Sequence, residues 1–334
     1  MSKDKILITG GAGFIGSHLT EKLLTLGYKV VAFDRYNISN DFNWLNELKK
    51  NKKKNCKFIL GDIRDYDSVF NAMKGCNTVF HLAALIGIPY SYRSPLAYIK
   101  TNLEGTYNVL EASKNLKIKN IIITSTSEVY GTAQKVPIDE THPINAQSPY
   151  AASKVGADQL AQSFYLSFGM PVGIIRPFNT YGPRQSARAV IPTIITQINS
   201  GNKTVKLGSV LPTRDFNYID DIVNGFIMAM NSSNSVGQTI NLGSNFEISI
   251  KDTFDMIKKI MNSDLEILQE QTRLRPKKSE VERLFSDNSL AKKLISWSPK
   301  FSGKEGLEKG LIKTVEWFSN EENLKKYKSE IFNF

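Results

Sequence analysis

The chain opens its first regular elements with the stretch ILITGGAGFIG, residues 6–16. The apolar and β-branched residues 6–9 predict a buried strand, and the apolar periodicity after them predicts a helix over 13–26. Between them, Gly10, Gly13 and Gly16 have the spacing GxxGxxG. Glycines in this arrangement allow a tight turn, a close approach of the backbone to a pyrophosphate, and close packing of the helix on the sheet. The helix N-terminus then offers free N–H groups and the positive end of its dipole to the phosphates.

The rest of the first half repeats this alternation of short strand and longer helix, which predicts βαβ units and a parallel sheet. Six parallel strands with right-handed crossovers form a doubly wound α/β sheet of the Rossmann type. After residue 176, loops rich in Gly, Pro and Arg predict a smaller α/β substrate-binding cap over 177–330, and we expect some later segments to return to the first domain, 1–176. The further strands are predicted over 29–34, 57–60, 78–81, 120–125 and 172–176, and the further helices over 67–73, 97–115 and 148–168.

Composition and charge are those of an ordinary globular protein. Hydrophobic residues make up 41% and charged residues 22% of the 334 residues. No apolar run is long enough to cross a bilayer, and the N-terminus lacks the form of a signal peptide. We expect a cytoplasmic protein with no membrane partner and no metal site, whose two cysteines, Cys56 and Cys76, are small buried side chains.

The net charge of +11 includes a lysine-rich stretch at 49–57. A basic balance can indicate nucleic acid as a partner, but no nucleic-acid-binding motif accompanies this stretch. The end of a solvated surface helix explains the lysines better, and an anionic small-molecule substrate also suits a basic protein. We therefore expect no nucleic-acid partner.

A carboxylate ends the second predicted strand at Asp34, eighteen residues beyond Gly16. A carboxylate there accepts hydrogen bonds from the adenosine ribose hydroxyls and repels a 2′-phosphate, so it favours NAD over NADP. The adjacent Arg35 is able to accommodate a phosphate and weakens this preference. At the end of the third strand, Asp62 is placed to hydrogen-bond the adenine amino group. We expect NAD as the cofactor of the 1–176 domain.

The stretch SPYAASK, residues 148–154, opens a long predicted helix. Tyr150 and Lys154 lie four residues apart and therefore share a helix face. A lysine ammonium beside a phenol favours the phenolate, so we expect a lowered tyrosine pKa and a general base near neutral pH. After the fifth strand, Thr126 is placed to hydrogen-bond the oxygen that Tyr150 deprotonates, and Glu128 is placed to act as a second acid–base group.

Together, the glycine fingerprint, Asp34, Thr126 and the Tyr150/Lys154 pair resemble the extended short-chain dehydrogenase/reductase family over nearly the whole chain. Members similar to this chain act on nucleotide sugars, as 4-epimerases, 4,6-dehydratases or uronate decarboxylases. The resemblance implies that all three begin by oxidising the sugar C4 hydroxyl with bound NAD. A member that binds NAD without turnover is a further alternative, against which the intact Thr126, Tyr150 and Lys154 argue.

The residues after Thr126 bear on the fate of the oxidised sugar. Dehydratases of this family carry Thr-Asp-Glu or Thr-Ser-Glu, and Ser127 and Glu128 match the second version. Uronate decarboxylases often carry a Ser-Glu pair too, so this triplet does not separate the two. Residues 176–197 look most like dehydratases of N-acetylglucosamine nucleotides from the legionaminic acid pathway. The resemblance leaves both GDP and UDP open as the nucleotide, with decarboxylase and 4-epimerase as alternatives.

The resemblance also implies a mechanism. Tyr150 takes the C4 hydroxyl proton as hydride passes to NAD, Glu128 removes the C5 proton as the C6 hydroxyl leaves, and hydride returns to C6. The implied catalytic residues are Thr126, Ser127, Glu128, Tyr150 and Lys154. The implied NAD-binding residues are Gly10, Gly13, Phe14, Ile15, Gly16, Asp34, Arg35, Asp62, Ile63, Leu82, Ala83, Ala84, Tyr150 and Lys154.

The nucleotide-sugar substrate is expected to meet four residues of the cap. Asn179 would contact sugar or phosphate oxygens, and Val190 would flank the base. Arg214 and Arg275 would hold the diphosphate, which suits the planar guanidinium group. The family resemblance further implies a homodimer, in which the helices 97–115 and 148–168 pair across a two-fold axis.

Overall fold

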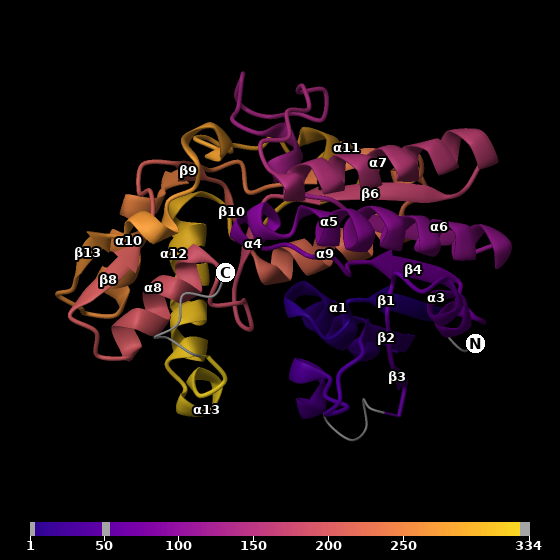
Figure 1. The fold of residues 1–334 in the computed structure, drawn as a ribbon, viewed down its shortest axis with the longest axis horizontal. Helices are drawn as coiled ribbons and strands as arrows, with labels where there is room; N and C mark the ends of the chain where they lie inside the picture. The colour runs from indigo at the N-terminus through magenta and orange to yellow at the C-terminus, as the bar shows by residue number, and fades with distance from the viewer. Residues whose placement is uncertain (1–3, 49–53, 328–334) are drawn as a thin grey trace.

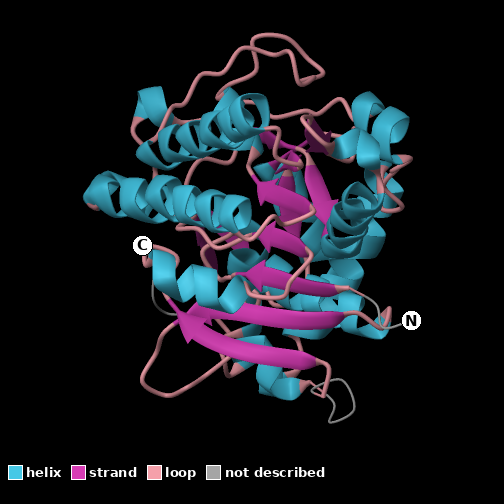
Figure 2. Ribbon diagram, turned by 90° about the vertical axis from the view of Figure 1, so that its right-hand side faces the viewer, coloured by secondary structure: helices cyan, strands magenta, loops and turns pink. Residues whose placement is uncertain are grey.

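A parallel sheet in the strand order β11-β6-β5-β4-β1-β2-β3 forms the centre of the larger domain. The structure is a computed structural model that describes residues 4–48 and 54–327, and Figures 1 and 2 show its arrangement. All six pairings in this sheet are parallel. Its strands are β1 (Lys5–Thr9), β2 (Lys29–Arg35), β3 (Cys56–Gly61), β4 (Thr78–His81), β5 (Asn120–Thr124), β6 (Val172–Pro177) and β11 (Thr239–Leu242).

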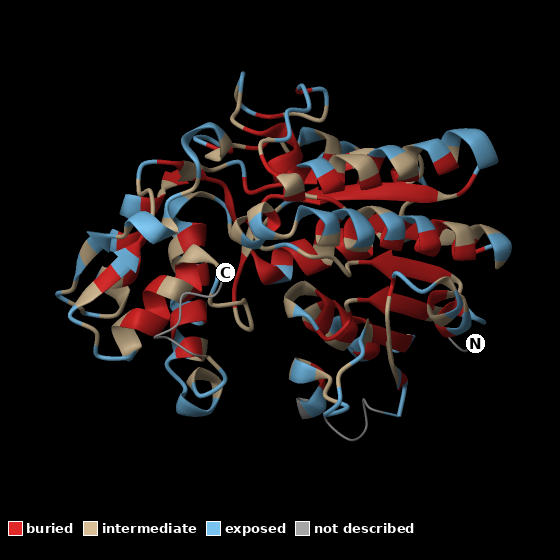
Figure 3. Cartoon of the chain, in the orientation of Figure 1, coloured by how far each residue is buried: buried red, intermediate tan, exposed pale blue. Residues whose placement is uncertain are grey.

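Alternate side chains of the sheet enter two separate cores, one on each face. In β1, Ile6 and Ile8 belong to one core and Leu7 to the other, because successive side chains of a strand point to opposite faces. The strands therefore read as continuous apolar runs, as expected where helices cover both faces, and Figure 3 shows them buried along most of their length. One face is covered by α1 (Phe14–Thr25), α9 (Ile219–Asn231) and α11 (Ser289–Ile295); the other by α3 (Tyr66–Met73), α6 (Gly105–Asn115) and α7 (Pro149–Phe168).

Local signals explain where the helix α7 begins and ends. The Ser148 side chain accepts a hydrogen bond from the Ala151 backbone N–H, and Pro149 occupies the first turn, where a missing N–H costs nothing. Gly169 ends the helix in the left-handed conformation, with φ of 63°. The prediction of a helix over 148–168 is confirmed, with Ser148 as its cap.

The predicted Rossmann-type fold is confirmed, and the structure differs from the prediction in two places. A seventh strand, β11, joins the sheet beside β6 from far along the chain, so the later segments expected to return include a strand of the sheet itself. The predicted helix 97–115 is divided into α5 (Pro95–Tyr98), a π-helical stretch η2 (Ile99–Glu104) and α6. The predicted division into 1–176 and 177–330 stays a prediction, and part of the lysine-rich stretch, 49–53, lies outside the described residues.

The cap lies to one side of the sheet, at the left of Figure 1. It contains three two-stranded pairs, β7 with β10, β9 with β12 and β8 with β13. These strands are β7 (Asn179–Tyr181), β8 (Thr204–Leu207), β9 (Thr213–Arg214), β10 (Phe216–Tyr218), β12 (Ile248–Ser249) and β13 (Glu266–Gln269). The remaining helices are α4 (Ile88–Arg93), α8 (Val190–Asn199), α10 (Ile250–Ile260), α12 (Gly303–Phe318) and α13 (Glu321–Leu324). Single 3₁₀ turns occur at η1 (Asn43–Glu47), η3 (Ser127–Tyr130), η4 (Ser233–Ser235), η5 (Gln271–Arg273) and η6 (Lys277–Ser279).

Among the described residues, none of the helices has the length and apolar character that a bilayer span requires.

A buried carboxylate, Asp215, joins three segments of the cap. It accepts hydrogen bonds from the backbone and hydroxyl of Ser244 and of Ser286, and from the Asn217 side chain. Gly243 packs so closely here that an added Cβ atom would lie 1.7 Å from the Ser286 hydroxyl. Asp215 therefore fixes the segment that carries its neighbour Arg214.

We expect Asp215→Ala to lower the free energy of unfolding by about 3 kcal/mol or more, because it leaves several buried donors without an acceptor. Urea unfolding followed by circular dichroism measures the change. Asp264→Ala, which removes an exposed carboxylate in a loop, serves as the control and should stay within about 0.5 kcal/mol of the parent. Equal stability of both variants would contradict the anchoring role of Asp215.

Candidate active site

The glycine turn after β1 packs tightly against neighbouring backbone. Because its glycines have no side chains, a ligand can approach the backbone of the turn. Gly10 has φ of 70°, and an added Cβ atom would lie 2.9 Å from the Ala83 backbone nitrogen. At Gly16 an added Cβ atom would lie 2.0 Å from the Gly10 carbonyl oxygen. The N-cap of α1, Gly13, has no side-chain cap, so the first N–H groups of α1, from Phe14 onward, are available to an anion. A pyrophosphate fits this turn.

Asp34 closes the turn from the end of β2. Its Oδ2 atom accepts from the Ala12 backbone N–H at 2.8 Å, and its Oδ1 atom accepts from the Arg35 N–H at 2.8 Å. Burial raises the pKa of Asp34, and these two backbone hydrogen bonds oppose that rise. Asp34 thus orients the glycine turn, while the side chain of Arg35 is exposed; the contact of Asp34 with a ribose stays a prediction.

The other predicted cofactor residues lie around the same sheet edge. Asp62 forms an ion pair with Arg64 at 2.5 Å, which holds the pKa of Asp62 below its usual range. Ile63 is buried and packs against Gly105. Three partly buried residues follow the end of β4, namely Leu82, Ala83 and Ala84, and the backbone of the first two lies against Gly10. Ile15, in the first turn of α1, is also partly buried.

His81 at the end of β4 has both ring nitrogens engaged. Nδ1 lies 2.8 Å from the Thr9 hydroxyl and Nε2 lies 3.0 Å from the Thr106 hydroxyl. Burial, with a smaller contribution from Lys154, lowers the pKa of His81 to about 3. A neutral histidine with both ring nitrogens hydrogen-bonded fits a structural role at the end of β4.

The predicted pair Tyr150 and Lys154 lies on the first two turns of α7, and both residues are buried. The Lys154 Nζ atom donates to the Thr124 carbonyl oxygen at 2.5 Å, which ties α7 to the end of β5. Thr126 lies two residues after Thr124, and its side chain hydrogen-bonds the Tyr150 hydroxyl. The structure therefore brings Thr126, Tyr150 and Lys154 together, as predicted.

The expected lowering of the Tyr150 pKa is wrong for the structure described. Burial raises the pKa of Tyr150, and the nearby carboxylate of Glu128 raises it further, while the hydrogen bond with Thr126 acts in the opposite direction. Lys154 is buried as well, and burial lowers its own pKa. The four-residue spacing correctly predicted that Tyr150 and Lys154 share a helix face, but it carries no information about how deeply the two side chains are buried.

Glu128 lies within the short turn η3, where its backbone N–H donates to the Thr126 hydroxyl at 3.2 Å. Its carboxylate is buried and lies 4.0 Å from the Arg275 Nη1 atom. Ser127 is buried beside it in the same turn. A carboxylate next to the Tyr150 hydroxyl gives the site a second group able to move a proton.

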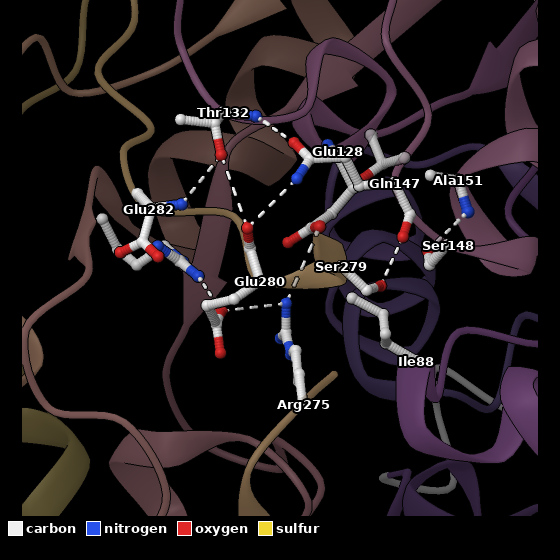
Figure 4. A network of polar contacts seen from close by, with 12 residues as sticks. Ile88, Glu128, Thr132, Gln147, Ser148, Ala151, Arg275, Ser279, Glu280 and Glu282 are labelled. Carbon is white, nitrogen blue, oxygen red and sulfur yellow. Dashed lines mark hydrogen bonds and ion pairs between the residues drawn. The ribbon is translucent and has the colours of Figure 1, made fainter. Parts of the chain in front are cut away.

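The two arginines predicted to bind substrate meet at one carboxylate. Glu280 lies 3.3 Å from the Arg214 guanidinium and 3.5 Å from that of Arg275, as Figure 4 shows for the Arg275 side. Arg214 is almost fully buried, and burial lowers its pKa despite the neighbouring Glu128 and Glu280. The Arg275 Nη1 atom is buried without a hydrogen-bond partner among the described residues. A phosphate oxygen would supply the missing acceptor.

The segment 275–282, here called the return segment, crosses from the cap to the residues just before α7. The Gln147 side chain donates to the carbonyl oxygens of Lys278 and Glu280 at 3.1 Å and accepts from the Thr132 N–H. Ser279 donates to the Gln147 carbonyl oxygen, and Figure 4 shows the contacts of Gln147 with Thr132, Ser279 and Glu280. They fix Arg275 and Glu280 relative to the helix that carries Tyr150.

Two predicted substrate residues lie elsewhere on the cap. Asn179 begins β7, and its Oδ1 atom is buried with no partner among the described residues. Val190 begins α8 and is partly buried against the cap core. The structure therefore leaves an acceptor at Asn179 for a ligand hydroxyl and offers an apolar surface at Val190.

Sequence reasoning missed Glu280, Gln147 and Tyr92. Tyr92, on α4, contacts the Ser279 hydroxyl at 2.7 Å and faces Glu128. The roles of these residues depend on contacts between distant segments, which the spacing of residues along the sequence does not indicate. Over residues 4–48 and 54–327, no group of three or more His, Cys, Asp or Glu side chains is arranged to hold a metal ion.

Comparison with known proteins assigns this geometry to a family. The family model described as GDP-mannose 4,6 dehydratase matches residues 7–310. A putative UDP-glucose 4-epimerase of Methanocaldococcus jannaschii is 33% identical over 321 residues, which cover 94% of this chain and 98% of that protein. A dTDP-D-glucose 4,6-dehydratase of Dictyostelium discoideum is 37% identical over 274 residues, which cover 77% of this chain and 62% of that protein.

Solved structures are consistent with the same family. The crystal structure of dTDP-glucose 4,6-dehydratase from Bacillus anthracis, in complex with NAD, superposes with a TM-score of 0.84 at 28% identity and covers 98% of this chain and 100% of that one. The prediction of NAD as cofactor is confirmed by such neighbours. The chain therefore belongs to the extended short-chain dehydrogenase/reductase family, within the group of enzymes that the GDP-mannose 4,6 dehydratase model describes.

Proposed function

We propose that the protein catalyses the NAD-dependent 4,6-dehydration of a nucleotide-activated sugar. The proposed substrate is UDP- or GDP-N-acetylglucosamine, as in dehydratases of the legionaminic acid pathway, and the product is the 4-keto-6-deoxy sugar nucleotide. One observation carries the proposal: a second buried acid–base group, Glu128, lies beside Tyr150 at the end of β5. Epimerisation at C4 needs no such group, whereas elimination across C5 and C6 needs a base for the C5 proton.

Tyr150 is the proposed base for the first step. It takes the C4 hydroxyl proton, while the Thr126 hydroxyl binds the same oxygen and the Lys154 ammonium favours the phenolate. NAD, when bound, would supply the acceptor for the hydride leaving C4 and the donor of the hydride that C6 receives. The glycine turn, Asp34 and the uncapped start of α1 are the residues proposed to hold NAD.

Glu128 is the proposed base for the second step. The C4 ketone acidifies the C5 proton, Glu128 removes it, and the C6 hydroxyl leaves as water. When hydride adds to C6, a proton returns to C5, which balances the proton that Tyr150 took from the C4 hydroxyl. Ser127 stands where other dehydratases carry Asp, and a hydroxyl is a far weaker acid than a carboxylic acid. We therefore assign the proton delivered to the leaving hydroxyl to Glu128, with Ser127 orienting the hydroxyl.

The substrate's diphosphate is proposed to bind Arg214 and Arg275, whose guanidinium groups converge within 3.5 Å of one carboxylate. The buried Oδ1 atom of Asn179 is proposed to accept from a sugar hydroxyl. Val190 is proposed to flank the base. These roles place the sugar between η3 and α7 and the nucleotide against the cap.

A homodimer is proposed from the outer faces of α5 to α7. Lys114 lies over the Phe168 ring at 4.6 Å, and Tyr107 packs edge-on against Phe164, so α6 and α7 form one continuous surface. A surface of this kind, rich in exposed apolar side chains, marks a protein interface. The exposed apolar residues on it are Leu96, Ile99, Tyr107, Leu166 and Phe168.

The reaction class is tested by incubating the purified protein with UDP-, GDP- and dTDP-sugars and analysing the products by mass spectrometry. Loss of one water supports dehydration. An unchanged mass would instead support a 4-epimerase, and loss of carbon dioxide from a uronate would support a decarboxylase; either result overturns the proposal.

Glu128→Gln should reduce water loss on the order of a hundredfold or more, because it removes the base for the C5 proton. Bound NADH should still form on mixing with substrate, since oxidation at C4 uses Tyr150. Absorbance at the NADH band and product mass measure the two steps separately. Glu305→Gln, an exposed change in α12, is the control. Full dehydration by Glu128→Gln would refute the assignment.

Asp34→Ala should weaken NAD binding roughly tenfold to a hundredfold, because a charged acceptor contributes about 1.5–3 kcal/mol to a hydrogen bond. NADP should lose less, since the repulsion of its 2′-phosphate disappears. Asp34→Asn keeps an acceptor for the Ala12 N–H and separates this effect from loss of the turn. Calorimetric titration with both cofactors gives the ratio, and an unchanged ratio in both variants would count against the role of Asp34.

Light scattering on the purified protein should give the mass of a dimer. Leu166→Glu places a charge on the most exposed apolar residue of α7 and should shift the mass to that of a monomer. A monomeric parent protein would show that this surface is not a homodimer interface.

A further inference from the structure

The proposed catalytic face of α7 continues for one more turn, to Asp158. Tyr150, Lys154 and Asp158 follow one another at four-residue spacing, so the three side chains lie on one helix face. Their exposed fractions are 7%, 4% and 2%. A carboxylate and a lysine buried in successive helical turns affect each other's charge state, because either charge is costly to bury alone.

Asp158 is held rigidly by its Oδ2 atom. That oxygen accepts from the Ser125 hydroxyl at 2.7 Å and from the Arg176 Nε and Nη2 atoms at 3.1 and 2.9 Å. Arg176 is fixed from its other side, where its Nη1 atom donates to the Tyr130 hydroxyl at 2.8 Å. Tyr130 in turn donates to Asn241 on β11 at 2.9 Å. The carboxylate therefore has a fixed orientation.

The other oxygen of Asp158 has no partner. Oδ1 is buried and makes no hydrogen bond among the described residues. Lys154 donates to the carbonyl of Thr124, and Asp158 accepts from Ser125, the next residue of the chain, so both side chains reach the end of β5 from successive turns of α7. A buried carboxylate oxygen left free in this position supplies negative potential to the ammonium.

We propose that Asp158 is a positioning residue for the Tyr150–Lys154 pair, whose carboxylate, held by Ser125 and Arg176, keeps the Lys154 ammonium charged beside Tyr150. Asp158 would act through Lys154 without touching substrate. The inference rests on the proposed role of Tyr150 and Lys154 in oxidation at C4, but not on the later elimination.

The groups around Lys154 leave Asp158 as its counter-charge. Along α7 Lys154 lies one helical turn from Tyr150 and one from Asp158, and from β4 it faces His81, whose lowered pKa leaves it neutral at physiological pH. Burial lowers the pKa of Lys154, and Asp158 is the group that raises it. Without Asp158, Lys154 and Arg176 would be two cations buried at one strand end, and the lysine would give up its proton more readily.

The test is the pH dependence of bound NADH formation after mixing the NAD-loaded enzyme with its nucleotide sugar. The rate should fall at alkaline pH as Lys154 loses its proton, which defines the alkaline limb of the profile. In Asp158→Asn the alkaline limb should move down by about one pH unit or more, and the rate at neutral pH should fall at least about tenfold.

Asp158→Asn leaves Arg176 without a carboxylate and can unfold the protein for that reason. The double variant Asp158→Asn/Arg176→Met removes both charges, keeps a long apolar stem in place of the arginine, and should show the same displaced limb. Asp264→Asn is the control for a carboxylate-to-amide change at an exposed site and should keep the parent profile.

A structural role for Asp158 alone would lower the rate at every pH and leave the alkaline limb in place. An unchanged alkaline limb in either folded, NAD-binding variant would therefore overturn the inference, whatever the size of the rate loss. If the parent enzyme forms no NADH with any nucleotide sugar, the proposed function fails and this inference fails with it. The two failures are distinguished by the behaviour of the parent.

Discussion

The hydrogen bond from the Lys154 ammonium to the Thr124 carbonyl oxygen joins α7 to the end of β5. The two elements carry different parts of the site: Tyr150 lies on the helix, and Thr126 and Glu128 lie in the turn after the strand. Ligands of open parallel sheets bind at this carboxyl edge. The buried hydrogen bond from Ser125 to Asp158 crosses the same junction, so the separation between these groups depends on the contacts of Lys154 and Asp158 with the end of β5.

Local spacing encoded the parts of this arrangement that were predicted correctly. The glycines at 10, 13 and 16 predict a turn because the backbone there has no room for Cβ atoms, and the close approaches at Gly10 and Gly16 bear this out. Tyr150 and Lys154 share a face because they lie one helical turn apart. In both cases the sequence distance is also the distance that matters in space.

Contacts between distant segments could not be predicted in this way. Glu280 meets Arg214 across 66 residues of chain, and β11 pairs with β6 after the cap has intervened. The π-helical stretch η2 interrupts a segment whose periodicity reads as one helix. The predicted direction of the Tyr150 pKa shift is wrong for a related reason. Burial decides that direction, and the spacing of residues does not reveal burial.

The buried charges of the site fall into two groups with different consequences. Around α7, Asp158 lies between two cations, Lys154 and Arg176, and no element of the cap takes part. On the cap side, Glu280 holds Arg214 and Arg275, and Arg275 also faces Glu128.

Under the proposed function, a diphosphate must compete with Glu280 for both guanidinium groups, because each already has a carboxylate partner. Arg275 also lies 4.0 Å from Glu128, so the guanidinium proposed to bind the diphosphate borders the proposed base for the C5 proton. After burial, the Glu128 carboxylate contributes to the raised pKa of Tyr150. The two groups of charges therefore meet between Glu128 and Tyr150, where the proposed bases for the two steps lie.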